Sequence, residues 1–138
     1  MKADEMTGAA VRAVLDRLAE VYVKRDVDLL QAVFASDPDV VLYSPGADGR
    51  FVGLSEIQTK AEGDWSRSEA ASLTYGWTSV SAAGSVAWAA TDADFTVKAG
   101  GQEMTLPAHI TFVLEKRGEQ WLIVHAHYSF ASAAETSS

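Results

Sequence analysis

The sequence has no cysteine, little basic charge and no long apolar run, and each absence excludes a class of protein. Without cysteine, the 138-residue chain has no disulfide scaffold, no thiolate nucleophile and no cysteine-ligated zinc site. No apolar run approaches the ~20 residues that a membrane-spanning helix needs. The opening residues 1–5 are largely polar and contain no apolar core of a signal peptide. We therefore expect a cytoplasmic protein without a membrane partner.

Basic residues are scarce relative to acidic ones. Eleven Lys and Arg residues face nineteen Asp and Glu residues, which gives a formal net charge of −8. A protein that binds nucleic acid needs a basic surface to neutralise phosphates, and none is visible here. The acidic balance also disfavours anionic membrane surfaces. Small molecules and other proteins are therefore the expected partners.

Apolar residues are plentiful, in contrast. They make up 48% of the chain, and four of them are tryptophans, so a substantial core is expected. The length suits one domain. No repeat or linker interrupts it, so we expect a single domain over residues 1–138 with an ordered core over about 7–130.

Helical periodicity is confined to the N-terminal half. Apolar residues recur at helical spacing over about 7–24, which predicts an amphipathic helix. Asp26 is placed to cap a second short helix that ends at 36–38. A strand is expected at 40–43. Ser55 and Gln58 resemble a capping box that opens a third helix, which ends near Arg67.

From residue 72 onward the apolar period changes to two. This predicts strands at about 72–81, 85–98, 103–115 and 120–129, separated by glycine-containing turns. Helices followed by a meander predict an α+β fold, in which three N-terminal helices pack on a strongly curved antiparallel sheet.

Hairpin turns fix register, so the turns predict which side chains share a face. A two-residue turn at Gly100-Gly101 places Asp92 opposite His109. Continuing across the sheet, we expect one face to carry mixed aromatic and polar residues: Tyr75, Trp77, Trp88, Asp92, His109, Thr111, Val113, Val124 and Tyr128. The other face carries Ile110, Phe112, Leu114, Trp121, Ile123, His125 and His127.

Both faces are largely apolar, whereas three short helices can cover only one of them. We expect the helices to cover the mixed face, because an apolar concavity with a few polar groups is typical of a small-molecule pocket. The residues expected to line it are Tyr22, Phe34, Tyr43, Trp65, Tyr75, Trp77, Trp88, Thr111 and Tyr128. The uncovered face then favours a homodimer. The residues expected in that interface are Ile110, Phe112, Leu114, Trp121, Ile123 and His125.

Three phrases of the sequence resemble the nuclear transport factor 2-like superfamily, in particular its SnoaL-like branch. They are the residues 34–40 (FASDPDV), 52–57 (VGLSEI) and 121–129 (WLIVHAHYS), and the order of elements agrees over about 7–130. The resemblance implies a cystatin-like cone with a pocket between sheet and helices, and dimers through the convex sheet face.

Steroid isomerisation is not expected despite the resemblance to ketosteroid isomerases. Those members use an aspartate at the end of the first strand, where this chain has Leu42-Tyr43. Their second acid corresponds to about Thr111 here, and the tyrosine of their first helix corresponds to about Leu18. Polyketide cyclases of the branch use a pocket carboxylate, a role that Asp92 could fill.

Asp92 and His109 form the candidate catalytic pair. A carboxylate that binds one imidazole nitrogen orients the ring and raises its basicity, which suits proton transfer. A buried polar pair that only satisfies itself, or an aspartate at the rim, is the alternative. His125 and His127 resemble a metal motif, but we expect no metal because too few ligands share their face.

The tyrosine hydroxyls and the tryptophans around the expected cavity favour a planar apolar ligand, although each alone is equally typical of plain packing. Three hypotheses follow. The first is a cofactor-independent cyclase, isomerase or dehydratase that acts on an apolar oxygenated substrate by acid–base catalysis. The second is a non-catalytic small-ligand binding protein. The third is a dimerisation module whose pocket has no function.

Overall fold

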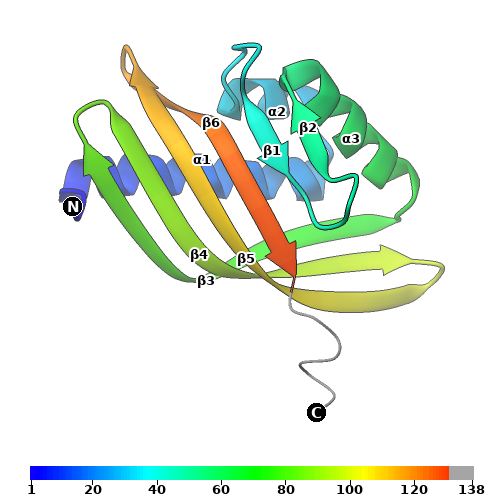
Figure 1. Ribbon diagram of the computed structural model, residues 1–138. Helices are drawn as coiled ribbons and strands as arrows, with labels where there is room; N and C mark the ends of the chain where they lie inside the picture. Colours follow the sequence, from blue (N-terminus) through cyan, green and yellow to red (C-terminus); the bar gives the residue numbers. More distant parts are fainter. Residues whose placement is uncertain (131–138) are drawn as a thin grey trace.

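In the computed structural model, residues 1–130 are described, and the expected end of the single domain at residue 138 lies outside them. Three helices pack on one side of a six-stranded sheet, with β3–β6 in front and α1 behind in Figure 1. The elements are α1 (Glu5–Lys24), α2 (Val27–Val33), β1 (Val41–Tyr43), β2 (Arg50–Val52), α3 (Leu54–Ser66), β3 (Ala70–Ala83), β4 (Val86–Ala99), β5 (Gln102–Arg117) and β6 (Gln120–Phe130). The predicted α+β class is confirmed. No helix among residues 1–130 is both long and apolar enough to cross a membrane.

The helices begin where local hydrogen bonds satisfy their first amide groups. The backbone N–H of Thr7 donates to the side chain of Asp4 at 2.7 Å, and Asp26 accepts from the N–H of Leu29 at 3.1 Å, as predicted for α2. The capping box predicted for α3 is wrong. That helix follows Gly53, which has a φ of 85° and no side-chain cap. Glu56 instead accepts from the N–H of Val52 in β2.

The sheet is mixed, and its strand order is β2-β1-β6-β5-β4-β3. The predicted meander of β3 to β6 is antiparallel throughout. The first strand, β1, pairs in parallel with β6 and in antiparallel with the short β2, which the sequence did not predict. The sheet therefore differs at one edge from the expected all-antiparallel arrangement.

The predicted register holds for β4 and β5 but fails for β6. Asp92 pairs with His109, as the Gly100-Gly101 turn requires. In the last hairpin Arg117 pairs with Gln120, so the turn lies at 118–119. A β-bulge at Val124 then adds one unpaired residue to β6. Since side chains alternate with a period of two, one extra residue moves every later side chain of β6 to the opposite face.

A second bulge interrupts β3. Gly76 and Trp77 together lie opposite Asp92, between the pairs Tyr75–Ala93 and Thr78–Thr91. Tyr75 therefore points toward the helices, whereas Trp77 lies on the other side and is 65% exposed. The two bulges add twist and bend, which suits the curvature of the sheet in Figure 1.

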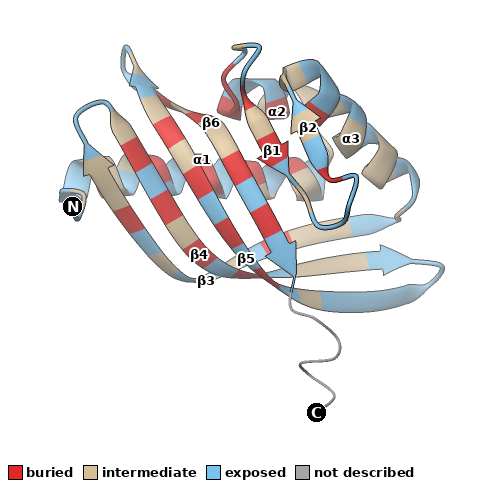
Figure 2. Ribbon diagram, in the orientation of Figure 1, coloured by how far each residue is buried: buried red, intermediate tan, exposed pale blue. Residues whose placement is uncertain are grey.

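The face under the helices is the opposite of the one predicted. We call the helix-covered side the inner face and the other side the outer face. Figure 2 shows buried and exposed residues alternating along β4 and β5, as expected for strands covered on one side. The core of the inner face contains five of the six residues predicted to form a dimer interface: Ile110, Phe112, Leu114, Trp121 and Ile123. Only His125 of that set lies on the outer face, so the predicted interface set is wrong.

The physical reason is that both faces have enough apolar residues to be buried. Polar groups on the mixed face suggested a cavity, whereas the helices cover the face with the denser aliphatic set. Phe112, Leu114 and Ile123 are completely buried there, in one core cluster with the apolar residues of α1.

Candidate ligand cavity

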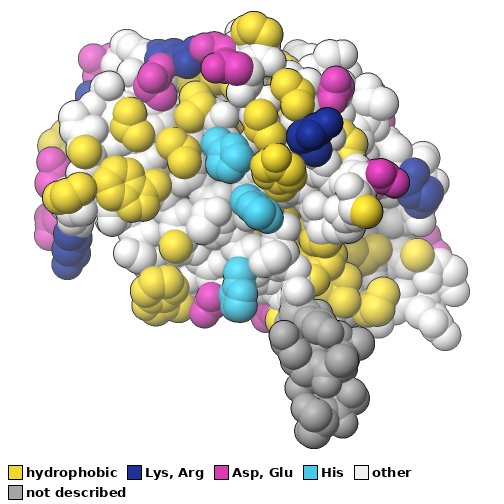
Figure 3. All heavy atoms as spheres, in the orientation of Figure 1, with side chains coloured by type: hydrophobic (Ala, Val, Ile, Leu, Met, Phe, Trp, Pro, Cys, Tyr) yellow, Lys and Arg dark blue, Asp and Glu magenta, His cyan; other side chains and the backbone are white. Residues whose placement is uncertain are grey.

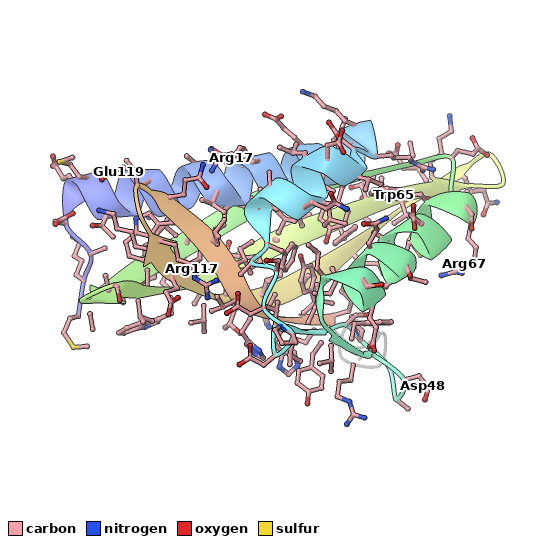
Figure 4. The ribbon with its side chains drawn as sticks, turned by 90° about the horizontal axis from the view of Figure 1, so that it is seen from above. Arg17, Asp48, Trp65, Arg67, Arg117 and Glu119 are labelled. Carbon is pink, nitrogen blue, oxygen red and sulfur yellow. The ribbon has the colours of Figure 1, made fainter. Side chains whose placement is uncertain are left out.

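A cavity of about 330 Å³ lies within the cone, between α3 and the curved part of the sheet. α1 and α2 supply its inner wall through Leu18, Tyr22 and Leu30. Its lining is mainly apolar and aromatic: Tyr22, Phe34, Trp65, Phe95, Tyr128 and Phe130 are the aromatic members. In Figure 4, Trp65 lies between α3 and the strands, whereas Arg67 extends from the end of α3 away from them.

Two tyrosine hydroxyls form the polar centre of this cavity. Tyr22 of α1 and Tyr128 of β6 are hydrogen-bonded through their hydroxyl oxygens at 2.9 Å. Burial raises the pKa of Tyr22 to about 12, and burial also raises the pKa of Tyr128. Phe95 packs edge-on against Tyr22, with ring centroids 4.8 Å apart. Both hydroxyls are therefore protonated at neutral pH, in an apolar setting.

The pair has one more O–H donor than the hydrogen bond between the two hydroxyls requires. Two hydroxyls carry two O–H donors, and a single hydrogen bond between them consumes one. Within residues 1–130, the structure gives neither hydroxyl any other hydrogen-bond partner. The remaining O–H is therefore available to an acceptor atom inside the cavity.

Charged residues occur at the rim. Asp64 of α3 accepts hydrogen bonds from Lys60 and, at 2.9 Å, from Arg67. Arg25 donates to the backbone oxygen of Trp65 and to the hydroxyl of Ser68, which fixes the end of α3 against α1. Among the described residues that line the cavity, Asp64 is the only carboxylate, and no histidine is present.

Four of the nine predicted pocket residues line the cavity: Tyr22, Phe34, Trp65 and Tyr128. Tyr75 is near but behind the wall, where its hydroxyl donates to the backbone oxygen of Leu15 at 2.7 Å. The other four predicted members, Tyr43, Trp77, Trp88 and Thr111, lie on the outer face and are exposed. The prediction that they line the pocket is wrong, because it assigned the mixed face of the sheet to the interior.

The predicted catalytic pair also lies outside the cavity. Asp92 and His109 are neighbours, with Oδ1 and Nε2 3.7 Å apart, but their side chains are 63% and 78% exposed on the outer face. The register prediction that joined them is confirmed, and the prediction that they point inward together is wrong. A pair in water has neither the desolvation nor the enclosed substrate that acid–base catalysis in a pocket requires.

Several lining residues were not predicted, among them Lys60, Phe95, Leu106 and Phe130. Phe95 and Leu106 face each other across β4 and β5, and both share the inner face with the buried Ala93 and Ala108. Strand parity alone would have identified them once the inner face was known. Nothing in the sequence indicated that Lys60 lines the cavity, because a lysine on a helix is equally typical of the face that points into solvent.

The residues 1–130 contain no group of three or more His, Asp or Glu side chains arranged to hold a metal ion. His125 and His127 lie on β6 and face outward, separated by Ala126, and each ring lies near that of Tyr43. The structure therefore places the metal-like motif outside the cavity as well.

Comparison with known proteins gives a family and a fold. The profile described as "SnoaL-like domain" matches residues 11–133. A nuclear transport factor 2-like superfamily protein from Salmonella enterica serovar Typhimurium LT2 is 22% identical, with a TM-score of 0.86 over 94% of each chain. No curated protein matches the chain in sequence.

Two further solved structures have the same fold at lower identity. A hexachlorocyclohexane dehydrochlorinase is 14% identical, with a TM-score of 0.82 over 92% of this chain and 86% of its own. An uncharacterised protein with a cystatin-like fold from Caulobacter vibrioides is 13% identical, with a TM-score of 0.76 over 94% of this chain and 93% of its own. These likenesses establish the fold alone.

Proposed function

Because the chain belongs to the family of SnoaL-like domains, we propose that its cavity binds a small, largely apolar molecule that carries an acceptor oxygen. The observation that supports this proposal is the spare O–H of the Tyr22–Tyr128 pair inside an apolar cavity. A buried donor without an acceptor is costly, so a ligand oxygen at this position gains a hydrogen bond in a site of low dielectric.

The size of the cavity limits the ligand. A volume of about 330 Å³ corresponds to about eleven water molecules at ~30 Å³ each. That is at the lower end of small-molecule pockets, which favours a compact ligand. The aromatic walls formed by Trp65, Phe95 and Phe130 favour a flat ring system.

Binding is better supported than turnover by the groups that line the cavity. Acid–base catalysis needs a base within reach of the substrate. The tyrosines can donate hydrogen bonds but cannot act as bases near neutrality, since burial keeps them protonated. Asp64, the only lining carboxylate among the described residues, is held at the rim by two cations. We therefore propose a binding protein rather than a cyclase, isomerase or dehydratase.

The test compares two ligands of the same shape, with and without the oxygen. Isothermal titration would measure 2-acetylnaphthalene against 2-isopropenylnaphthalene, in wild type and in the double variant Tyr22→Phe/Tyr128→Phe. We expect the ketone to bind wild type about tenfold more tightly, which is the effect of one buried hydrogen bond, and the double variant to lose that preference. Tyr75→Phe, which removes a hydroxyl outside the cavity, is the matched control. Equal affinity of wild type for both compounds, or no binding of either, would overturn the proposal.

We also propose that the outer face contacts a second copy of the chain. It exposes large apolar side chains, among them Trp77, Trp88 at 36% and Tyr43 at 39%, and contiguous exposed apolar surface is typical of interfaces. The four long strands, at ~4.8 Å spacing and ~3.3 Å per residue over about eleven residues, span roughly 700 Å². A standard interface buries about 800 Å² per partner.

A further inference from the structure

All three histidines of the chain lie on the outer face. His109 is on β5, and His125 and His127 are on β6. His127 shares a pair position with Thr111, two residues along β5 from His109. Figure 3 shows the three imidazoles in a line down the middle of this face, with apolar side chains around the upper two and acidic side chains beside the lowest one. The bulge at Val124 produces this arrangement, because without it His125 and His127 would point inward.

The carboxylates nearest these imidazoles lie beside His109. Asp92 approaches His109 to 3.7 Å, and Asp94, which is on the same side of β4, lies two residues further along that strand. Tyr43 lies beside the other two, with ring centroids 6.3 Å from His125 and 5.2 Å from His127. At the margins of the outer face, Arg50 of β2 pairs with Tyr43 in the ladder, and Glu115 of β5 accepts a hydrogen bond from Arg117. His125 and His127 therefore lack a nearby carboxylate within the described part of the chain, whereas His109 has one.

We propose that proton uptake by His125 and His127 separates the two copies that meet through the outer face. This inference rests on the proposed contact between copies and adds its regulation. The contact between sheets buries the two rings of each copy, and burial disfavours the charged form of an imidazole. In water an imidazole takes up a proton near pH 6.5. The assembled form is therefore fully favoured above about pH 6.5 and is lost as the pH falls below it.

A second electrostatic effect acts in the opposite direction but is smaller. Protonation brings the chain closer to neutrality from −8, which weakens the general repulsion between copies. At 0.15 M salt that repulsion is screened beyond about 8 Å. The four rings of His125 and His127 in a pair of copies lie within the contact itself, where screening is weak. We therefore expect the local effect to dominate.

The magnitude follows from the number of rings. Each ring that the contact keeps neutral weakens association by up to about tenfold per pH unit below the ordinary range of an imidazole. Four such rings set an upper limit of about 10⁴-fold. Partial exposure at the edge of the contact lowers this value, so we expect a rise of at least 100-fold in the dissociation constant between pH 8.0 and 5.5.

Analytical ultracentrifugation of the full chain at both pH values in 0.15 M NaCl tests the proposal. Far-UV circular dichroism at pH 5.5 verifies that the chain stays folded. We expect wild type to be dimeric at pH 8.0 and mainly monomeric at pH 5.5. His125→Gln/His127→Gln is expected to remain dimeric at both values. His109→Gln, which removes the histidine already paired with Asp92, is the matched control and should retain the pH response.

The two proposals fail in different ways. A wild type that is monomeric at pH 8.0, at concentrations up to hundreds of micromolar, overturns the contact between copies and the regulation with it. A wild type that is dimeric at both pH values, or a double glutamine variant that still dissociates at pH 5.5, overturns the proton control alone. Trp88→Glu, which places a fixed charge on the same face, is expected to be monomeric at pH 8.0 and so locates the contact.

Discussion

The hydrogen bond between Tyr22 and Tyr128 makes a quantitative prediction about stability. The two hydroxyls lie 2.9 Å apart, and a neutral hydrogen bond contributes about 0.5–1.5 kcal/mol net. Tyr22→Phe removes that bond and leaves the hydroxyl of Tyr128 without its partner, at a further cost of up to ~1–3 kcal/mol. Since the cavity is large enough to hold water, we expect the lower part of this range and a total loss of about 1–2 kcal/mol. Tyr128→Phe should behave in the same way.

The double variant Tyr22→Phe/Tyr128→Phe isolates the interaction between the two hydroxyl groups, because both aromatic rings remain. Replacing both hydroxyls by hydrogen leaves no unpaired polar group, so its loss should be smaller than the sum of the two single losses by about 1 kcal/mol. Urea unfolding, with a common slope for all four proteins, measures the difference. Tyr75→Phe, whose hydroxyl donates to the backbone of Leu15, combined with Tyr22→Phe should be additive. A double variant whose loss equals the sum of its parts would refute the pairing of the two hydroxyls.

Three other predictions follow from the observed faces and charges. Ile110→Ala should lower the free energy of unfolding by about 2–5 kcal/mol, because the side chain is fully buried. Thr111→Ala, at the next position but on the outer face, should change this free energy by less than ~0.5 kcal/mol. Equal effects of the two variants in urea unfolding would contradict the assignment of faces. Hydrogen bonds from Arg117 lower the pKa of Asp37, so its contribution to stability is present above about pH 4, where a free aspartate titrates, and is lost as the pH falls through the lowered folded value. Asp37→Asn should therefore flatten the acid side of the stability profile, and an unchanged profile would count against the pair. Asp92→Asn should leave ligand affinity unchanged in calorimetry, and a loss of tenfold or more would return this residue to the site.

The sequence predicted what depends on local periodicity. The stripe of α1 placed Tyr22 toward the sheet, and the spacing along α3 placed Trp65 in the cavity. The glycine turn at 100–101 gave the register of β4 and β5 over their full length. These features depend on residues that are close together in the chain, so the local pattern predicts them without knowledge of the rest of the molecule.

The remainder of the site depended on two β-bulges and on which face the helices cover, and a periodic pattern reveals neither. A bulge is one additional residue without a partner, and Val124 is as typical of a regular strand as of a bulge. Gly76 was a weak signal for the other bulge, because glycine in a strand often marks one. Both faces also had apolar residues enough for a core, so composition could not decide which one the helices cover. The positions of Asp92, His109 and the predicted interface all depended on that decision.

The bulge at Val124 also makes the last strand intolerant of changes in length. Deleting that one residue would restore strict alternation, so each side chain of 125–130 would move to the opposite face of the sheet. The imidazoles of His125 and His127 would then point into the cone, and Ala126 and Tyr128 would point outward. Tyr22 would lose its partner, and the cavity would lose part of its wall. We therefore expect related sequences to differ in this segment by substitutions and to keep the same number of residues between Ile123 and Phe130.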